Sequence, residues 1–276
     1  MKVHHLNCGT MRPLGGRLID GRGGFWHRAE LVCHCLLVET ASELVLIETG
    51  LGSPAVTRAD EWLGARFVRM VGVRTSVAET AAEQVRRLGY ALTDVRHIVL
   101  THLDLDHAGG LVDFPHATVH VHAEELRALR SPRDARERSR YKPQHFAHGP
   151  QWSSYPDTGE KWFGFDAVRQ LDGLPPEILL VPLGGHTRGH AGVAVDTGEG
   201  WLLHAGDAFF HHGQIDPVRP HVTPGLAWFE SKVETVPGAR RGNHQRLREL
   251  VRDHGDEVSV LSAHDPWFLD DVVSGR

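Results

Sequence analysis

The stretch that most constrains this chain is residues 101–110, which read Thr-His-Leu-Asp-Leu-Asp-His-Ala-Gly-Gly. Four side chains that can bind a metal fall within six consecutive positions of it: His102, Asp104, Asp106 and His107. Leucines alternate with them, so an extended backbone projects the first two to one side, and a turn brings the last two beside them. The stretch therefore predicts a site for two neighbouring cations.

The flanks of this stretch indicate where the site lies in the fold. An apolar run at residues 97–100 precedes it and predicts a strand, so the ligands would stand at a strand end. Gly109 and Gly110 follow it, and glycine lets a backbone reverse tightly because it has no Cβ. We expect the chain to turn back directly beside the metals.

The composition fits a layered metal enzyme. A chain of 276 residues can bury one large core, and we expect a single domain over residues 1–276. The formal charge of −5 gives no overall attraction for a phosphate backbone, so nucleic acid is not an expected partner. The 21 histidines exceed what packing or capping requires, and neutral imidazole is a preferred ligand of transition metals.

The cysteines and the N-terminus bear on the compartment. Three cysteines, Cys8, Cys33 and Cys35, cannot build an even disulfide framework in one chain. Cys33 and Cys35 could bind a metal, but they lie in an apolar run at residues 31–38, and packing in a buried strand is the preferred interpretation. Without an apolar signal segment or a stretch of about 20 apolar residues, we expect a cytoplasmic protein with no membrane partner.

Short apolar segments rich in Val, Ile and Leu predict strands between helices. The predicted strands cover residues 31–38, 44–48, 97–100, 118–122, 178–181, 192–196, 201–204 and 258–261. Helices are predicted over residues 76–88 and, after a capping Asn243, over residues 243–254. This mixture favours a layered α/β arrangement with sheets inside and helices outside.

The least regular part is residues 131–173, which contain four prolines and show no clear period. A loop of this length is usually functional or disordered, and its large aromatic side chains argue for order. Two interpretations of these aromatics are open: they form one wall of a substrate pocket, or they pack the insertion onto the sheets. They are Trp152, Tyr155, Trp162, Phe163 and Phe165. A basic run at residues 133–142 predicts a solvated face, with recruitment of an anionic substrate as the alternative.

Further polar side chains come directly after other predicted strands. They are Glu48, His186, His190, Asp207 and His264. Loops at strand ends of a rigid scaffold commonly carry chemistry, so their recurrence predicts that they converge with residues 102–107 on one metal centre.

With these motifs the chain resembles the metallo-β-lactamase superfamily of hydrolases, whose signature is His-x-His-x-Asp-His followed by a later His, an Asp and a final His. The resemblance spans roughly residues 31–265 and implies a four-layer αββα sandwich of two mixed sheets, with two divalent metal ions at one edge. By that likeness one ion is held by His102, Asp104 and His186, the other by Asp106, His107 and His264, and both by Asp207.

The resemblance also assigns supporting residues and shows one departure. Glu48 stands where the family usually has the Asp of Asp-Thr-Gly, and we expect it to support the ligands. His190 is expected to support or line the site, with ligation in place of His186 as the alternative. Asp104 replaces the second His of the signature, and its harder carboxylate favours manganese or iron more than imidazole does, although zinc remains the expected ion.

Two such cations lower the pKa of a shared water to near 7 and polarise a carbonyl or phosphoryl oxygen, so the resemblance implies hydrolysis. Asp106 is the predicted catalytic residue, accepting or relaying a proton of the attacking water. The length, the final His264-Asp265 pair and the Gly-His-Thr motif look most like N-acyl homoserine lactonases. We therefore expect a small-molecule lactone or ester as substrate, and a homodimer as many relatives form.

The substrate side departs from those lactonases. They place a Tyr three residues after the bridging Asp, whereas this chain has Phe210. Phe has no hydroxyl, and a polar side chain could substitute for it: His211, His212, Tyr141 or Tyr155. The alternatives are an iron-dependent redox enzyme of the sulfur dioxygenase type, or a thioesterase, a phosphotriesterase or a β-lactam hydrolase.

Overall fold

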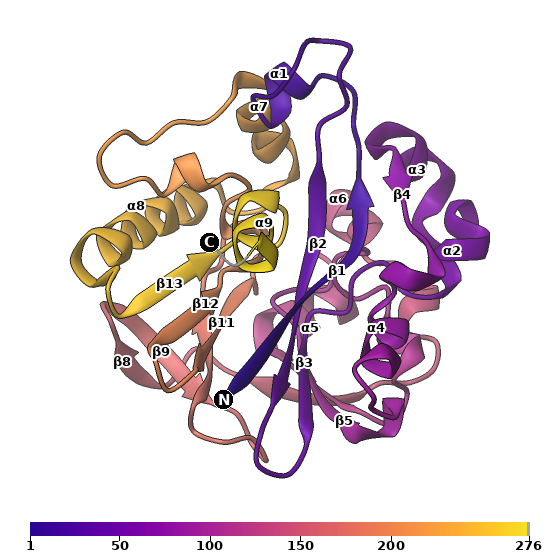
Figure 1. Ribbon diagram of the computed structural model, residues 1–276, viewed down its shortest axis with the longest axis vertical. Coiled ribbons are helices and arrows are strands. Elements are labelled where there is room, and N and C mark those ends of the chain that lie inside the picture. Colours follow the sequence, from indigo (N-terminus) through magenta and orange to yellow (C-terminus); the bar gives the residue numbers. More distant parts are fainter. Residues whose placement is uncertain (275–276) are drawn as a thin grey trace.

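The computed structural model describes residues 1–274, in which two β-sheets lie face to face and helices cover their outer sides (Figure 1). The first sheet has seven strands in the order β4-β1-β2-β3-β5-β6-β7. Their bounds are β1 Lys2–Met11, β2 Leu31–Glu39, β3 Leu44–Ile47, β4 Val73–Arg74, β5 Val95–Val99, β6 Thr118–His122 and β7 Gln151–Tyr155.

The second sheet has six strands in the order β13-β12-β11-β10-β9-β8. Their bounds are β8 Glu160–Trp162, β9 Phe165–Gln170, β10 Ile178–Pro182, β11 Ala191–Asp196, β12 Trp201–His204 and β13 Val258–Leu261. The α-helices are α1 Gly16–Ile19, α2 Pro54–Ala59, α3 Ala65–Val71, α4 Ala81–Arg87, α5 Ala123–Arg130, α6 Ala135–Arg140, α7 Pro224–Val233, α8 Pro237–His254 and α9 Pro266–Ser274. This is the predicted sandwich of two mixed sheets flanked by helices.

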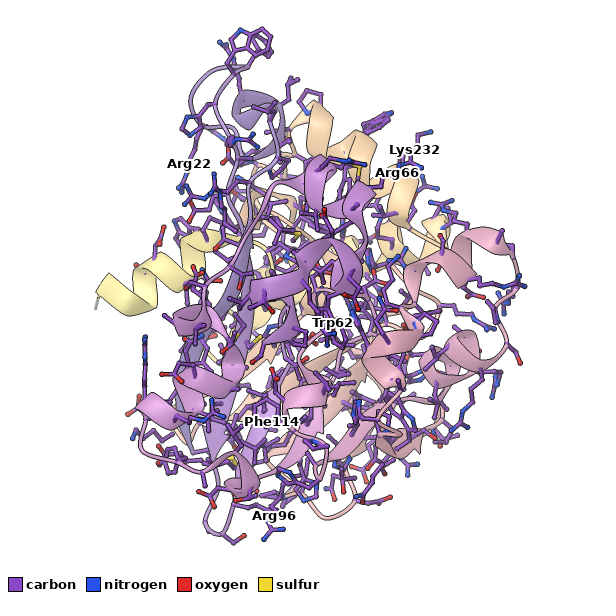
Figure 2. The ribbon with its side chains drawn as sticks, turned by 90° about the vertical axis from the view of Figure 1, so that its right-hand side faces the viewer. Arg22, Trp62, Arg66, Arg96, Phe114 and Lys232 are labelled. Atoms are coloured by element: carbon purple, nitrogen blue, oxygen red, sulfur yellow. The ribbon has the colours of Figure 1, made fainter. Side chains whose placement is uncertain are left out.

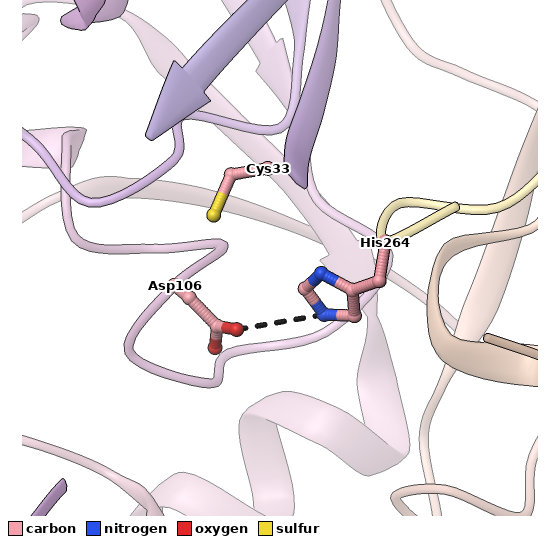
Figure 3. A group of neighbouring side chains, drawn as sticks. All are labelled: Cys33, Asp106 and His264. Carbon is pink, nitrogen blue, oxygen red and sulfur yellow. Dashed lines mark ion pairs between the residues drawn. The ribbon is translucent and has the colours of Figure 1, made fainter. Parts of the chain in front are cut away.

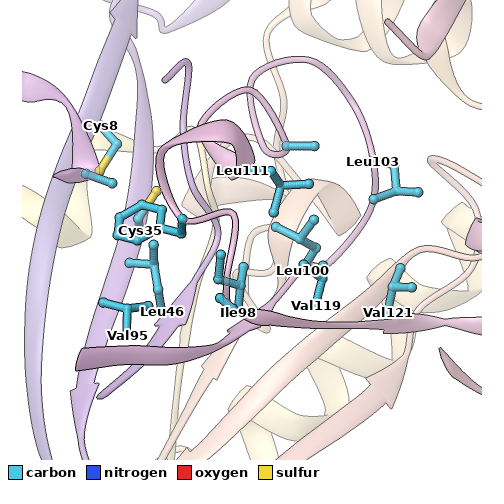
Figure 4. Packing of buried hydrophobic residues seen from close by; sticks show 14 of the residues in the cluster. Cys8, Cys35, Leu46, Val95, Ile98, Leu100, Leu103, Leu111, Val119 and Val121 are labelled. Carbon is cyan, nitrogen blue, oxygen red and sulfur yellow. The ribbon is translucent and has the colours of Figure 1, made fainter. Parts of the chain in front are cut away.

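The alternation of side chains along the strands builds the layers. On β2, Leu36 and Val38 belong to the apolar cluster between the two sheets, which also holds Val193 of β11. The intervening Cys35 and Leu37 point to the opposite face and pack in the cluster under α4 and α5. Figure 4 shows Cys35 in that cluster, among side chains of β3, β5 and β6. Both faces of β2 are therefore buried, which is why it reads as a continuous apolar run.

The outer layers close the two remaining faces. Leu247 and Leu250 of α8 pack against the second sheet with Val258 of β13. On the other side, Figure 2 shows Trp62 and Phe114 inside the fold and the charged Arg96 at its edge. Among the described residues, every helix is too short or too polar to span a lipid bilayer.

Residues 131–173 are more regular than predicted. They contain α6 and three strands: β7 at the edge of the first sheet, β8 at the edge of the second, and β9 between β8 and β10. Polar and charged residues interrupt all three strands, so none of them shows a continuous apolar run. The segment therefore extends both sheets and is not an irregular insertion.

Helix α8 also differs from its prediction. It begins at Pro237, six residues before the predicted cap Asn243. Asn243 is buried inside the helix and donates a hydrogen bond to the carbonyl of Gly184 at 2.8 Å. Its role is to tie the helix to the loop after β10.

Candidate metal centre

Strand direction brings the predicted ligands to one edge of the sandwich. β3 and β5 are parallel, so Glu48 and residues 101–107 leave the first sheet at the same end. β12 and β13 are also parallel, and β10 runs in their direction because β11 is antiparallel to both β10 and β12. His186, Asp207 and His264 therefore leave the second sheet together.

Two groups of possible ligands form at this edge. The first group is His102, His186 and Asp207, and the second group is His107, Asp207 and His264; in each, the ligand atoms lie within 4.8 Å of one another. Asp207 belongs to both. Its Oδ2 lies 3.8 Å from Nε2 of His102 and 3.3 Å from Nε2 of His186. Its Oδ1 lies 3.3 Å from Nε2 of His107 and 3.2 Å from Nε2 of His264.

Asp106 lies on the side of the second group. Its Oδ2 is 3.5 Å from Nε2 of His264, and its Oδ1 is 3.9 Å from Nε2 of His107. His102 thus lies in the first group, and Asp106 and His107 lie on the side of the second.

Several atoms that face this centre are buried without a hydrogen-bond partner. They are Nε2 of His102, Nε2 of His107 and Oδ1 of Asp207. Unpartnered buried polar groups cost about 1–3 kcal/mol each, so their clustering needs a physical reason. Nitrogen and carboxylate oxygen atoms that converge in this way fit divalent cations such as zinc.

Other residues orient the ligands. Glu48 accepts a hydrogen bond from the amide of Thr101 at 2.6 Å on one oxygen, and its other oxygen lies 2.7 Å from Nδ1 of His107. His190 accepts a hydrogen bond from the amide of Asp207 at 2.9 Å. Hydrogen bonds of this kind fix the direction of the side chain or backbone that they hold.

The backbone of Glu48 has a positive φ of 64°, a conformation that residues other than glycine rarely adopt. Burial alone would raise the pKa of Glu48, but the charge of His107 and its hydrogen bond override this and hold that pKa at about 2. An ionised Glu48 can therefore accept both of its N–H donors.

Asp104 is engaged by a residue outside the predicted site. Its Oδ2 lies 3.4 Å from Nε2 of His102 and 3.1 Å from Nε2 of His186, within reach of the first group. However, Arg140 of α6 binds both carboxylate oxygens, with Nε donating to Oδ1 at 2.8 Å and Nη2 to Oδ2. Nη2 also lies 2.6 Å from Nε2 of His186.

The Arg140 guanidinium changes the electrostatics of the first group. Burial alone would raise the pKa of Asp104, but Arg140 overrides this and holds that pKa well below its ordinary value. Burial and the same cation lower the pKa of His186 to about 4. Arg140 thus offsets the extra negative charge that Asp104 brings, and its position contradicts the prediction that residues 133–142 form only a solvated face.

The sequence analysis also missed Glu125 on α5, which is fully buried. Its Oε1 accepts hydrogen bonds from the amide of Leu103 at 3.0 Å and from the hydroxyl of Tyr141 at 3.3 Å. Glu125 thereby holds the loop that carries the ligands. A buried carboxylate in a helix with a polar face leaves no pattern that could have revealed it.

The two glycines of the loop stand where a Cβ has no room. A Cβ on Gly109 would lie 2.5 Å from the carbonyl oxygen of Leu51, and one on Gly110 would lie 2.5 Å from that of Thr49. The loop is therefore pressed against the chain that follows β3, and this close approach excludes side chains here.

The aromatics predicted on the substrate side lie in packing clusters instead. Trp152 packs against the cluster under α4 and α5, together with Phe146. Tyr155 is in the cluster between the sheets, and its hydroxyl lies 2.8 Å from Nδ1 of His120. Trp162 belongs to the cluster under α8. Of the two interpretations, packing onto the sheets is therefore the one that these contacts support.

Phe210 and His211 do lie beside the centre. The ring of Phe210 stacks on that of His264, with centroids 5.1 Å apart and planes inclined by 23°. Phe210 and His211 line a small pocket together with Leu226 and Asp265. Nδ1 of His211 accepts a hydrogen bond from the amide of Gly213 at 3.0 Å, so Nε2 is the ring atom that a ligand can use.

Comparisons with known proteins agree with this architecture. The model of the metallo-beta-lactamase superfamily matches residues 28–261. The chain is 43% identical over 266 residues to the probable metallo-hydrolase Rv2300c of Mycobacterium tuberculosis, covering 96% of this chain and 81% of that protein. It is 24% identical over 237 residues to an N-acyl homoserine lactonase of a Bacillus species, covering 86% and 82%.

A solved N-acyl homoserine lactone hydrolase, with the product N-hexanoyl-L-homoserine bound at its catalytic metal center, has the same fold. The TM-score is 0.71 at 19% identity, covering 98% of this chain and 95% of that one. The family model spans most of the chain, and the relative of 43% identity is aligned over nearly all of it. The chain therefore belongs to the metallo-beta-lactamase superfamily.

Proposed function

We propose that this metal-dependent hydrolase binds two divalent cations and opens the carbonyl–oxygen bond of a small lactone or ester. One observation carries the proposal: the carboxylate of Asp207 directs one oxygen to each of two histidine groups. Zinc is the expected ion, with manganese or iron as the alternatives that Asp104 favours.

In this proposal His102, His186 and Asp207 hold the first cation, and His107, His264, Asp106 and Asp207 hold the second. Asp104 also binds the first cation while it keeps its hydrogen bonds to Arg140. It can do both because each carboxylate oxygen has two lone pairs. When bound, the two ions supply a water of lowered pKa and a Lewis acid for the carbonyl oxygen.

Asp106 is suited to move the proton of the attacking water. Its side chain is 12% exposed, whereas those of His107, Asp207 and His264 are at most 4% exposed. A carboxylate at the open side of the centre can accept a proton and pass it to the departing alkoxide. The outcome is one water added across the ester bond, giving an acid and an alcohol.

The small pocket beside the second group has both apolar and polar walls, and Asp20, Arg22, Glu30 and Asp265 are among its polar side chains. Phe210, Leu226 and Ile19 give it apolar walls, and His211 offers a polar atom near the ring of Phe210. A lactonase relative and a structural neighbour that holds an N-acyl homoserine product favour a lactone substrate with an acyl chain.

The test joins metal analysis to a substrate screen. Purified protein should contain two divalent cations per chain and hydrolyse lactones or aryl esters faster than phosphotriesters, thioesters or β-lactams. A protein that carries two metals but cleaves none of the esters or lactones would refute the proposal. One iron per chain with oxygen consumption would refute it in favour of a redox enzyme.

The role of Asp106 has its own test. Asp106→Asn keeps an oxygen ligand but cannot accept a proton, so kcat should fall about 100-fold or more while KM changes little. Metal content separates this effect from loss of a cation. Full turnover by a variant that retains both metals would show that Asp106 moves no proton.

A further inference from the structure

A buried thiol completes the surroundings of the second group. Cys33 lies near the start of β2 and is 3% exposed. Its Sγ, a carboxylate oxygen of Asp106 and a ring nitrogen of His264 all lie within 4.8 Å of one another. Figure 3 shows the three side chains around one space, with the sulfur directed toward the side where Asp106 and His264 meet.

The position of Cys33 relative to His264 is set by hydrogen bonds on both sides of it. Nδ1 of His264 donates to the carbonyl of Val32 at 2.7 Å, and the amide of His34 donates to the carbonyl of Ala263 at 2.9 Å. The backbone around Cys33 is thus joined to the loop that carries His264. This link also leaves Nε2 of His264 to face the second group.

Other atoms of the second group are buried without a partner and face the same centre. Nε2 of His107 and Oδ1 of Asp207 make no hydrogen bond and lie 3.3 Å apart. A cation beside the thiol would give these two atoms a partner. Apolar packing around Cys33 leaves them without one.

We propose that Cys33 is a thiolate ligand of the second cation, an inference that rests on the metal centre of the proposed function. The sulfur–metal bond forms as the S–H bond breaks, and the proton leaves to solvent without any oxidation. The apolar side chains behind Cys33, among them Met11, Leu51 and Trp62, shield the sulfur from water.

A thiolate makes the two metal positions chemically different. The second cation would be surrounded by His107, His264, Asp106, Asp207 and a soft sulfur, and the sulfur shifts the preference toward zinc. The first position has a carboxylate, Asp104, whose charge Arg140 already offsets. The second position should therefore fill first and bind its ion more tightly.

Cobalt reports this bond directly, because a thiolate bound to Co(II) gives an intense charge-transfer absorption in the near ultraviolet. In a titration of metal-free protein, the band should reach nearly full intensity with the first equivalent of cobalt. The second equivalent should add only the weaker visible bands. Cys33→Ser should abolish the charge-transfer band and weaken the tighter cobalt site by at least about tenfold, the loss that even outer partners of a metal cause.

Cys35→Ser is the matched control, because Cys35 lies on the same strand, is 1% exposed and belongs to none of the groups of possible metal ligands among the described residues. It should keep the band. X-ray absorption of the zinc-loaded natural protein needs no variant and should show a sulfur neighbour at about 2.3 Å.

The outcomes separate the two proposals. Cobalt bound without a sulfur band, or a zinc shell of nitrogen and oxygen alone, would overturn the role of Cys33 and leave the hydrolase proposal standing. A sulfur band in a protein that hydrolyses no ester or lactone would support Cys33 and refute the substrate. A protein that binds no cobalt or zinc would refute both.

Discussion

The guanidinium of Arg140 closes on both carboxylate oxygens of Asp104 and at the same time lies 2.6 Å from Nε2 of His186. Arg140 therefore competes with a cation for the lone pair of His186. It also repels that cation, since unit charges 4 Å apart interact by about 4 kcal/mol at a protein surface.

Arg140→Ala should raise the affinity of the first group for divalent cations by at least about tenfold. The metal-free protein should become less stable, because a carboxylate that loses a buried partner costs about 3–5 kcal/mol. Competition with a chelator and thermal unfolding measure the two effects. Arg138→Ala, an exposed position on the same helix, should change neither. Weaker metal binding by Arg140→Ala would mean that the guanidinium arranges the ligands instead of competing.

Glu48→Gln should weaken metal binding about 10- to 100-fold. Glu48 receives one N–H donor on each oxygen, from Thr101 and from the ring of His107, whereas Gln offers only one oxygen. One donor would then face an amide NH₂ group. Zinc affinity, measured by competition with a chromophoric chelator, tests this, and Glu43→Gln at the other end of the same strand is the control. Unchanged affinity would remove Glu48 from the support of the centre.

Phe210→Tyr should raise kcat/KM for lactones by about tenfold or more. The ring already lies against His264 and lines the pocket, so a hydroxyl there could donate to the substrate oxygen as negative charge develops. Phe210→Leu, which adds no donor, should not produce the gain. If Tyr and Leu have the same effect, the position contributes only apolar contact.

His120 should make the protein less stable in mild acid. It is buried beside His97, and burial with the nearby imidazole lowers its pKa to about 3, against 6.5 in an unfolded chain. Below pH 6.5 the unfolded state therefore gains a proton that the folded state does not. The free energy of unfolding should fall by up to about 1.4 kcal/mol per pH unit as the pH drops from 6.5 toward 3.

Urea unfolding of chelator-treated protein at several pH values measures this slope without a contribution from metals. His120→Gln should reduce the slope by one proton, and the exposed His27→Gln serves as the control. An identical slope in wild type and His120→Gln would show that His120 does not take up the proton.

Strands rich in Val and Leu were predictable, whereas strands whose pattern is interrupted by polar side chains were not. Strands β6, β12 and β13 have the bounds predicted from their composition, because each holds at least two Val or Leu residues within a short stretch. β1 was missed because His4, His5 and Asn7 interrupt its apolar pattern, although it pairs with β2 over most of its length. Polar side chains also concealed β7, β8 and β9.

Some residues of the site could also be predicted from the sequence, and others could not. Residues at strand ends, such as Asp207 and His264, could be predicted together because strand ends share an edge. The contacts of Arg140, Glu125 and Cys33 could not, since nothing in a single sequence shows which distant residues these side chains will meet in the fold. Cys33 is buried in a strand, as its apolar surroundings in the sequence predict. Its sulfur lies beside the centre because β2 packs next to the loop that carries His264.

The ligand groups draw on both sheets, with residues 102–107 following β5 and His186, Asp207 and His264 following β10, β12 and β13. A bound cation would therefore act as a cross-link between the two halves of the sandwich. Because such an ion binds only the assembled form, it would oppose separation of the halves more strongly than their apolar contacts alone. Resistance to unfolding and to proteolysis would then follow the supply of metal, and a cell short of zinc would lose the enzyme by degradation as well as by inactivation.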